Sequence, residues 1–131
     1  MMIADTDVLV DFLRGGGWAP RVELELSTGR LSTTVIAAFE LIQGARTPRA
    51  QEDVRALLDA LEIVVLDARA TALAGEVRRL LLGRGNDIGV ADSLVAGICL
   101  KQDAMLLTRN RAHFQRVEGL SLASEPTDPP R

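Results

Sequence analysis

Three acidic residues of this sequence stand next to apolar residues, where a charged carboxylate is costly unless something compensates its charge. Asp5 follows a short apolar run at the N-terminus, and Glu40 and Asp92 each lie among the apolar residues of a predicted helix. A single acid in the first turn of a helix is ordinarily a solvated residue that the helix dipole favours. Three acids with this placement instead indicate one shared site.

Carboxylates that share a site repel one another, which raises their pKa values unless a divalent cation neutralises them. Oxygen ligands with no His or Cys nearby favour Mg²⁺ or Mn²⁺, and the single His113 and single Cys99 argue against zinc. With no His or Lys in the proposed cluster, the simplest chemistry is metal-assisted hydrolysis of a phosphodiester by a metal-bound water. Both a one-ion and a two-ion site are open.

Short apolar strands and amphipathic helices alternate along the chain and must position these acids. The predicted strands cover residues 1–4, 31–33, 63–66 and 104–107, with a possible edge strand at 120–123. The predicted helices cover residues 8–13, 19–27, 34–44, 48–61, 68–82 and 88–102, followed by a short turn at 111–115. This alternation predicts an α/β fold with a short parallel sheet flanked by helices on both faces.

The predicted sheet suggests where the acids meet, because ligands bind beyond the carboxyl ends of parallel strands. Asp5 lies at that end of the first strand, and Asn110 lies just past the equivalent end of the strand 104–107. Glu40 lies about two turns into the helix after the second strand. We therefore expect Asp5, Glu40 and Asp92 to line one cleft.

Length and composition indicate one domain at residues 1–123, followed by a proline-rich tail at 124–131 that is expected to be disordered. One cysteine excludes an internal disulfide framework, and no apolar run is long enough to span a membrane, so a cytoplasmic protein is expected. The net charge is −3, yet the three proposed site acids account for that excess. The net charge of the chain therefore neither excludes nor predicts RNA binding.

Four sequence blocks, in order and at the expected separations, resemble the PIN-domain family. These blocks are residues 3–11, 32–44, 88–96 and 107–110. The chain length and the ending Thr-Arg-Asn-x-x-x-Phe are most similar to the VapC-type toxins of VapBC toxin–antitoxin pairs. The resemblance implies a PIN-like three-layer fold and an Mg²⁺- or Mn²⁺-dependent endoribonuclease that cuts structured RNA such as transfer or ribosomal RNA. It also implies that Asp5, Glu40 and Asp92 hold the metal, and that the toxin forms a homodimer and binds a VapB-type antitoxin.

One departure from the family pattern concerns its fourth acid, whose usual places hold Asn110 and His113 here. Asn110 can accept a hydrogen bond from a metal-bound water or offer its amide carbonyl as a neutral ligand, so we keep it as a site residue. His113 is interpreted as a surface residue of a short turn. A weaker fourth ligand favours one tightly held ion over two.

Several neighbours of the acids have both a functional and a structural interpretation. Thr6 can orient Asp5 or cap the helix that starts at Asp7. Thr108 can support the site through its hydroxyl and Arg109 can contact the scissile phosphate, but each is equally compatible with a structural role. Asp11 is interpreted as a peripheral acid or an ion-pair partner.

The first two helices offer an apolar surface on which an antitoxin segment could lie. Its candidate residues are Leu9, Phe12, Trp18 and Leu26, and the simpler alternative is that they pack inward.

Two other functions remain open. A phospho-acceptor receiver domain needs a Lys after a late strand, whereas the only Lys, Lys101, lies inside a predicted helix. A catalytically weak or inactive PIN-like module that binds RNA or protein is consistent with the missing fourth acid.

Overall fold

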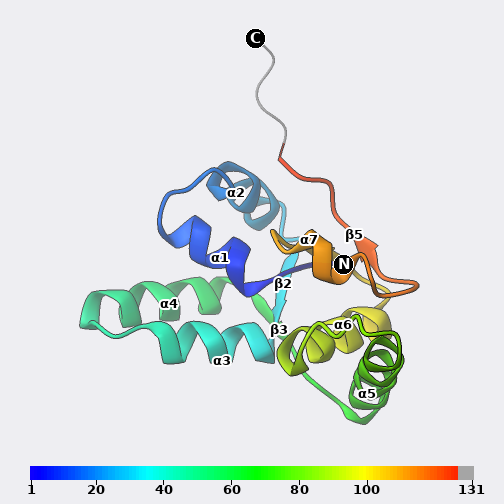
Figure 1. The fold of residues 1–131 in the computed structure, drawn as a ribbon. Coiled ribbons are helices and arrows are strands. Elements are labelled where there is room, and N and C mark those ends of the chain that lie inside the picture. The colour runs from blue at the N-terminus through cyan, green and yellow to red at the C-terminus, as the bar shows by residue number, and fades with distance from the viewer. Residues whose placement is uncertain (127–131) are drawn as a thin grey trace.

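The computed structural model describes residues 1–126, which form a five-stranded parallel sheet with helices on both faces (Figure 1). The strand order is β3-β2-β1-β4-β5, so the first strand lies at the centre. The strands are β1 (Met2–Ala4), β2 (Leu31–Thr34), β3 (Glu62–Val64), β4 (Met105–Leu107) and β5 (Ser121–Leu122). The predicted fold class is confirmed.

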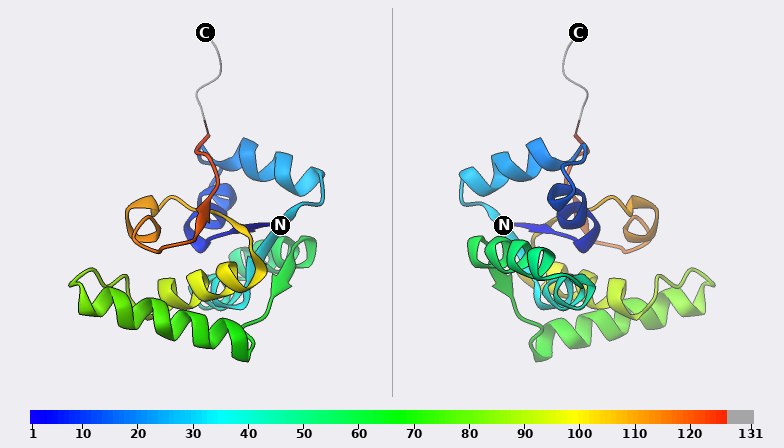
Figure 2. Two further views of the ribbon diagram at one scale, coloured as in Figure 1. Left: turned by 90° about the vertical axis from the view of Figure 1, so that its right-hand side faces the viewer. Right: turned by 90° about the vertical axis from the view of Figure 1, so that its left-hand side faces the viewer.

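Seven helices connect and cover these strands in the described part of the chain. They are α1 (Thr6–Leu13), α2 (Ala19–Ser27), α3 (Val35–Gly44), α4 (Pro48–Ala60), α5 (Ala68–Gly83), α6 (Val90–Gln102) and α7 (Arg111–Phe114). Figures 1 and 2 both show α5 and α6 side by side, with α1 and α2 on the other side of the sheet. None of the helices within residues 1–126 combines the length and the hydropathy that crossing a bilayer requires.

The two faces of the sheet bury two separate apolar cores, because successive side chains of a strand point to opposite faces. Ile3 and Leu106 belong to the core that α5, α6 and α7 cover. Their neighbours Ala4 and Leu107 belong to the core under α1, α2 and α4. Strand β1 is buried on both faces, as a central parallel strand should be.

The α6 helix is held against α5 by a close contact of backbones. A Cβ added at Gly97 would lie 2.6 Å from Ala74 Cβ and 2.7 Å from the Ala74 nitrogen. Glycine therefore lets the two helices approach, and this packing fixes the position of the helix that carries Asp92.

Several predicted boundaries differ from the structure by one or two residues. The third strand ends at Val64 rather than at residue 66, and the first helix begins at Thr6, with Asp5 as its N-cap, rather than at Asp7 or Val8. The sequence pattern missed this cap because Asp5 also ends the strand before it.

The apolar surface predicted on α1 and α2 is not free. Leu9 is fully buried, and the other three candidate residues pack against the same core. The inward-packing alternative therefore holds. Residues 124–126 have no regular secondary structure, and the rest of the predicted disordered tail, residues 127–131, lies outside the described residues.

Candidate active site

An open pocket lies beyond the carboxyl ends of β1 and β4. The residues that line it are Asp5, Thr6, Asp7, Val10, Arg14, Glu40, Asp92, Arg109 and Asn110. The three predicted acids thus share one pocket, although each comes from a different block of the sequence. The arrangement follows from the parallel sheet, which gathers strand ends and helix starts at one edge.

Asp5 is the most buried acid of this pocket, with 6% of its surface exposed. Its Oδ1 accepts the backbone N–H of Thr6 at 2.9 Å, and its Oδ2 accepts the Thr108 hydroxyl at 2.9 Å. Burial, together with the nearby carboxylates of Asp7 and Asp92, raises the pKa of Asp5 to about 7. Around neutral pH this carboxyl therefore exchanges its proton readily.

Glu40 is held by a hydroxyl from the first helix. Thr6 Oγ1 donates to Glu40 Oε1 at 2.9 Å, which joins α1 to α3 across the pocket. Neither of the two roles predicted for the Thr6 side chain is observed. Asp5 caps the helix through the Thr6 backbone, and the Thr6 hydroxyl orients Glu40 rather than Asp5.

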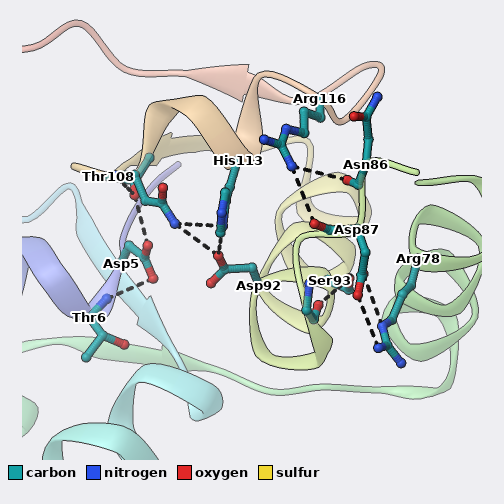
Figure 3. A network of polar contacts seen from close by, with 12 residues as sticks. Asp5, Thr6, Arg78, Asn86, Asp87, Asp92, Ser93, Thr108, His113 and Arg116 are labelled. Atoms are coloured by element: carbon teal, nitrogen blue, oxygen red, sulfur yellow. Dashed lines mark hydrogen bonds and ion pairs between the residues drawn. The ribbon is translucent and has the colours of Figure 1, made fainter. Parts of the chain in front are cut away.

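Asp92 lies in the first turn of α6 and meets the segment that follows β4. Asn110 Nδ2 lies 3.2 Å from Asp92 Oδ2, and His113 Nδ1 lies 2.9 Å from the same oxygen. Figure 3 shows the His113 ring directed at Asp92, with Asp5 and Thr108 beside them.

The interpretation of His113 as a surface residue of a short turn is therefore incomplete, because its ring also contacts Asp92. The N-terminal turn of α7 places its ring against Asp92, and 39% of the side chain remains exposed. The prediction that no His lies near the acids is wrong, because His113 contacts Asp92. The Asn110 amide approaches Asp92 as a donor, and its backbone N–H donates to Thr108 Oγ1 at 3.0 Å. The role of Asn110 toward a metal-bound water stays a prediction.

Comparisons with known proteins decide the family of this fold and site. The PIN domain family model matches residues 2–120. The chain is a PIN-domain protein. It is 32% identical over 124 residues to Ribonuclease VapC10 of Mycobacterium tuberculosis, covering 92% of this chain and 90% of that one. It therefore belongs among the VapC ribonucleases.

Other similar proteins are also VapC endonucleases or VapBC complexes. It is 25% identical over 120 residues to the tRNA(fMet)-specific endonuclease VapC of Shigella flexneri, covering 88% of this chain and 91% of the relative. Its structure resembles VapBC2 from Rickettsia felis bound to a promoter DNA fragment, with a TM-score of 0.84 and 26% identity over 93% of this chain and 96% of that one. DNA-bound VapBC from Salmonella typhimurium matches with a TM-score of 0.80 and 25% identity, over 93% of this chain and 96% of that one.

The remaining predicted residues of the PIN domain lie at the rim of the pocket. The Arg109 guanidinium forms an ion pair with Asp11 at 3.4 Å, and the Arg109 backbone N–H donates to Asp7 Oδ1 at 3.2 Å. Asp11 also accepts the Trp18 backbone N–H at 2.8 Å, so it is the ion-pair partner that was predicted. Asp7 is an acid of the first turn of α1, and its contact with the Arg109 backbone also fixes the loop after β4.

Two further lining residues add charge to the pocket. Arg14 reaches it from the end of α1. Asp7 adds a fourth carboxyl to it, and burial raises the pKa of Asp7 as well. A helical period of about four residues from Asp7 through Val10 to Arg14 could have indicated this shared face.

The donor atoms of the pocket suit a hard cation, because carboxylate and amide oxygens face it. Within residues 1–126, however, no three His, Cys, Asp or Glu side chains lie close enough together to hold a metal ion in this arrangement. Burial first, and the nearby carboxylate of Asp7 second, raise the pKa of Asp5 and disfavour its charged form. The residues that line the pocket therefore fit a divalent cation in chemical type, although their oxygens are not gathered closely enough in this arrangement to hold one.

Proposed function

We propose that this ribonuclease is the toxin of a type II toxin–antitoxin pair, which hydrolyses phosphodiester bonds in structured RNA with the help of Mg²⁺ or Mn²⁺. The observation that carries the proposal is the convergence of Asp5, Glu40 and Asp92 on one open pocket at the carboxyl edge of the sheet. Acids so placed suit a divalent cation that is shared with a phosphate.

Asp5, Glu40 and Asp92 are the residues proposed to hold the cation. A cation held there would supply an activated water and would neutralise charge on the phosphoryl oxygens. The hydroxyls of Thr6 and Thr108 fix the orientation of Glu40 and Asp5 before any ligand arrives. Because Asp5 must lose its proton to bind a cation, we expect cation affinity to rise with pH through about 7.

The RNA is proposed to lie across the rim of this pocket. Arg14 and Arg109 line it and can contact the phosphates on either side of the scissile bond without reading sequence. The name of the relative from Shigella flexneri, a tRNA(fMet)-specific endonuclease, supports a transfer RNA substrate, and ribosomal RNA is the alternative. The VapBC titles of the similar structures support a VapB-type antitoxin as partner, and a homodimer is proposed with it.

RNA cleavage by matched variants tests the proposal. Wild type is compared with Asp5→Asn, Glu40→Gln and Asp92→Asn, at a series of Mg²⁺ and Mn²⁺ concentrations and in EDTA, with transfer RNA and ribosomal RNA as substrates. The matched controls are Asp59→Asn and Glu52→Gln, because both of these acids are exposed on α4 and neither lines the pocket.

We expect cleavage to require the cation, to fall by about 100-fold or more in each site variant and to persist in both controls. Each site variant should stay folded in metal-free buffer, because it removes repulsion between carboxylates. Equal cleavage in EDTA would contradict metal dependence, and unfolding of Asp92→Asn would make that acid structural.

The second candidate is a PIN module that binds RNA without cutting it, which the replacement of the fourth family acid by His113 favours. RNA binding by wild type with no cleavage on either substrate, at any concentration of either cation, would support this candidate over the nuclease.

A further inference from the structure

Three polar atoms from α6, α7 and the loop before α7 form a triangle at the pocket. His113 Nδ1 lies 2.9 Å from Asp92 Oδ2 and 2.9 Å from Asn110 Nδ2, and the Asn110 and Asp92 atoms are 3.2 Å apart. Figure 3 shows the dashed contacts that meet at Asp92 and His113.

Hydrogen bonds cannot satisfy all three sides of this triangle. When Nδ1 of His113 carries a proton, it donates to Asp92 but faces the Asn110 amide, which is also a donor. When Nδ1 carries no proton, it accepts from Asn110 but faces a carboxylate oxygen, which is also an acceptor. In either tautomer, one side at 2.9 Å pairs two groups of the same kind.

A cation removes this conflict. Rotating the Asn110 side-chain amide by 180° exchanges the positions of its NH₂ group and its carbonyl oxygen. The three atoms of the triangle can then all offer lone pairs to a cation: the imidazole nitrogen of His113 and one oxygen each from Asp92 and Asn110. Ligands about 2.1 Å from an octahedral ion lie roughly 3.0 Å from one another. The triangle already has these dimensions, with sides of 2.9, 2.9 and 3.2 Å.

We propose that His113 binds the cation of this site through Nδ1, beside Asp92 and the Asn110 carbonyl, and that the site prefers a transition-metal dication such as Mn²⁺ to Mg²⁺. The inference rests on the proposed function, since it concerns the same cation. An imidazole ligand favours first-row transition metals, whereas sites made of oxygens alone suit Mg²⁺ equally well. The replacement of an acid by His113 thus changes the choice of metal rather than removing a ligand.

Pulsed electron paramagnetic resonance on Mn²⁺ tests this contact directly. His113 is the only histidine of the chain, so in tag-free protein any imidazole nitrogen coupled to Mn²⁺ must belong to it. We expect ¹⁴N coupling in wild type, its replacement by ¹⁵N coupling in protein labelled with [¹⁵N]histidine, and its loss in His113→Gln. The isotope comparison needs no mutation, so the test does not depend on the folding of the variant.

Mn²⁺ and Mg²⁺ affinities give a second measurement that does not depend on catalysis. Calorimetry should find that His113→Gln weakens Mn²⁺ binding about tenfold and leaves Mg²⁺ binding within about twofold, whereas the Glu52→Gln control changes neither.

The outcomes separate this inference from the proposed function. One outcome is that wild type binds Mn²⁺ and Asp92→Asn does not, but the bound Mn²⁺ shows no coupling to histidine nitrogen. This result would overturn the role of His113 and leave the acidic site standing. His113 would then only hold Asp92 in place. A folded wild type that binds neither Mn²⁺ nor Mg²⁺ would overturn both proposals.

Discussion

The hydroxyl of Thr108 donates a 2.9 Å hydrogen bond to Asp5 Oδ2 across the carboxyl ends of β1 and β4. The two residues follow Ala4 and Leu107, which are register partners in the sheet. Thr108 is fully buried and also accepts the backbone N–H of Asn110. Sheet register therefore sets the position of the most buried acid and, through Asn110, that of the loop that reaches Asp92.

Thr108→Val should destabilise the protein, because it replaces the hydroxyl by a methyl group of similar size. It leaves a buried oxygen of Asp5 and the Asn110 N–H without a partner, which costs about 1–3 kcal/mol in free energy of unfolding. Urea denaturation at pH 6 measures this loss. Thr108→Ser keeps the hydroxyl and should recover more than half of it, and equal losses in both variants would attribute the effect to packing instead.

Asp5 makes stability depend on pH in metal-free buffer. Its pKa is about 7 in the folded state and near 3.8 when unfolded, so between these values the unfolded chain binds fewer protons than the folded one. The contribution of Asp5 to the free energy of unfolding should therefore fall as pH rises through this window, by roughly 4 kcal/mol in total, and be constant above and below it.

Asp5→Asn isolates this contribution, since asparagine does not titrate. The variant should gain stability over wild type by roughly 2–3 kcal/mol between pH 5 and pH 8, measured by urea denaturation in EDTA. Any change in hydrogen bonding to Thr108 shifts the curve equally at all pH values. A difference between variant and wild type that does not change with pH would show that Asp5 ionises normally in the folded protein.

The convergence of Asp5, Glu40 and Asp92 could be predicted from the sequence because it depends on features with strong local signals. A buried parallel strand fixes where its carboxyl end lies, and the helical pattern places Asp92 in the first turn of α6 and Glu40 in the middle of α3. Their shared pocket follows from those two facts.

The contact between His113 and Asp92 could not be predicted in this way. The two residues are 21 positions apart, and the four-residue helix α7 is too short for its spacing to show which side it presents. The predicted end of β3 was wrong for a related reason. Val65 and Leu66 continue the apolar run but leave the sheet, which only the pairing of β3 with β2 determines.

Thr6 should matter for catalysis through Glu40 alone. Thr6→Val removes the 2.9 Å hydrogen bond to Glu40 Oε1 and keeps the backbone N–H that Asp5 accepts. We expect kcat to fall about tenfold, with a smaller change in KM, because Glu40 loses its fixed orientation. RNA cleavage kinetics measure this, and Thr6→Ser should restore most of the rate. An unchanged kcat in Thr6→Val would mean that Glu40 needs no such support.

Two glycines of the α5–α6 pair should respond to the same substitution with opposite signs. Gly97→Ala places a methyl group against Ala74 and the Ala70 carbonyl oxygen, both of which belong to the packed α5 helix. Because backbone cannot move aside as a side-chain tip does, the variant should lose about 1–3 kcal/mol in free energy of unfolding. The displaced α6 helix also carries Asp92, so RNA cleavage should fall in the protein that remains folded.

Gly75→Ala is the matched control, since Gly75 lies inside α5 and an added Cβ there meets no atom within 4 Å. This variant should gain about 0.5–1 kcal/mol through helix propensity and leave cleavage unchanged. Thermal and urea denaturation measure the change in stability of each variant, and RNA cleavage assays measure the change in activity. If Gly97→Ala were as stable as wild type, α5 and α6 would have to separate at little cost, and their close contact could not be what positions Asp92.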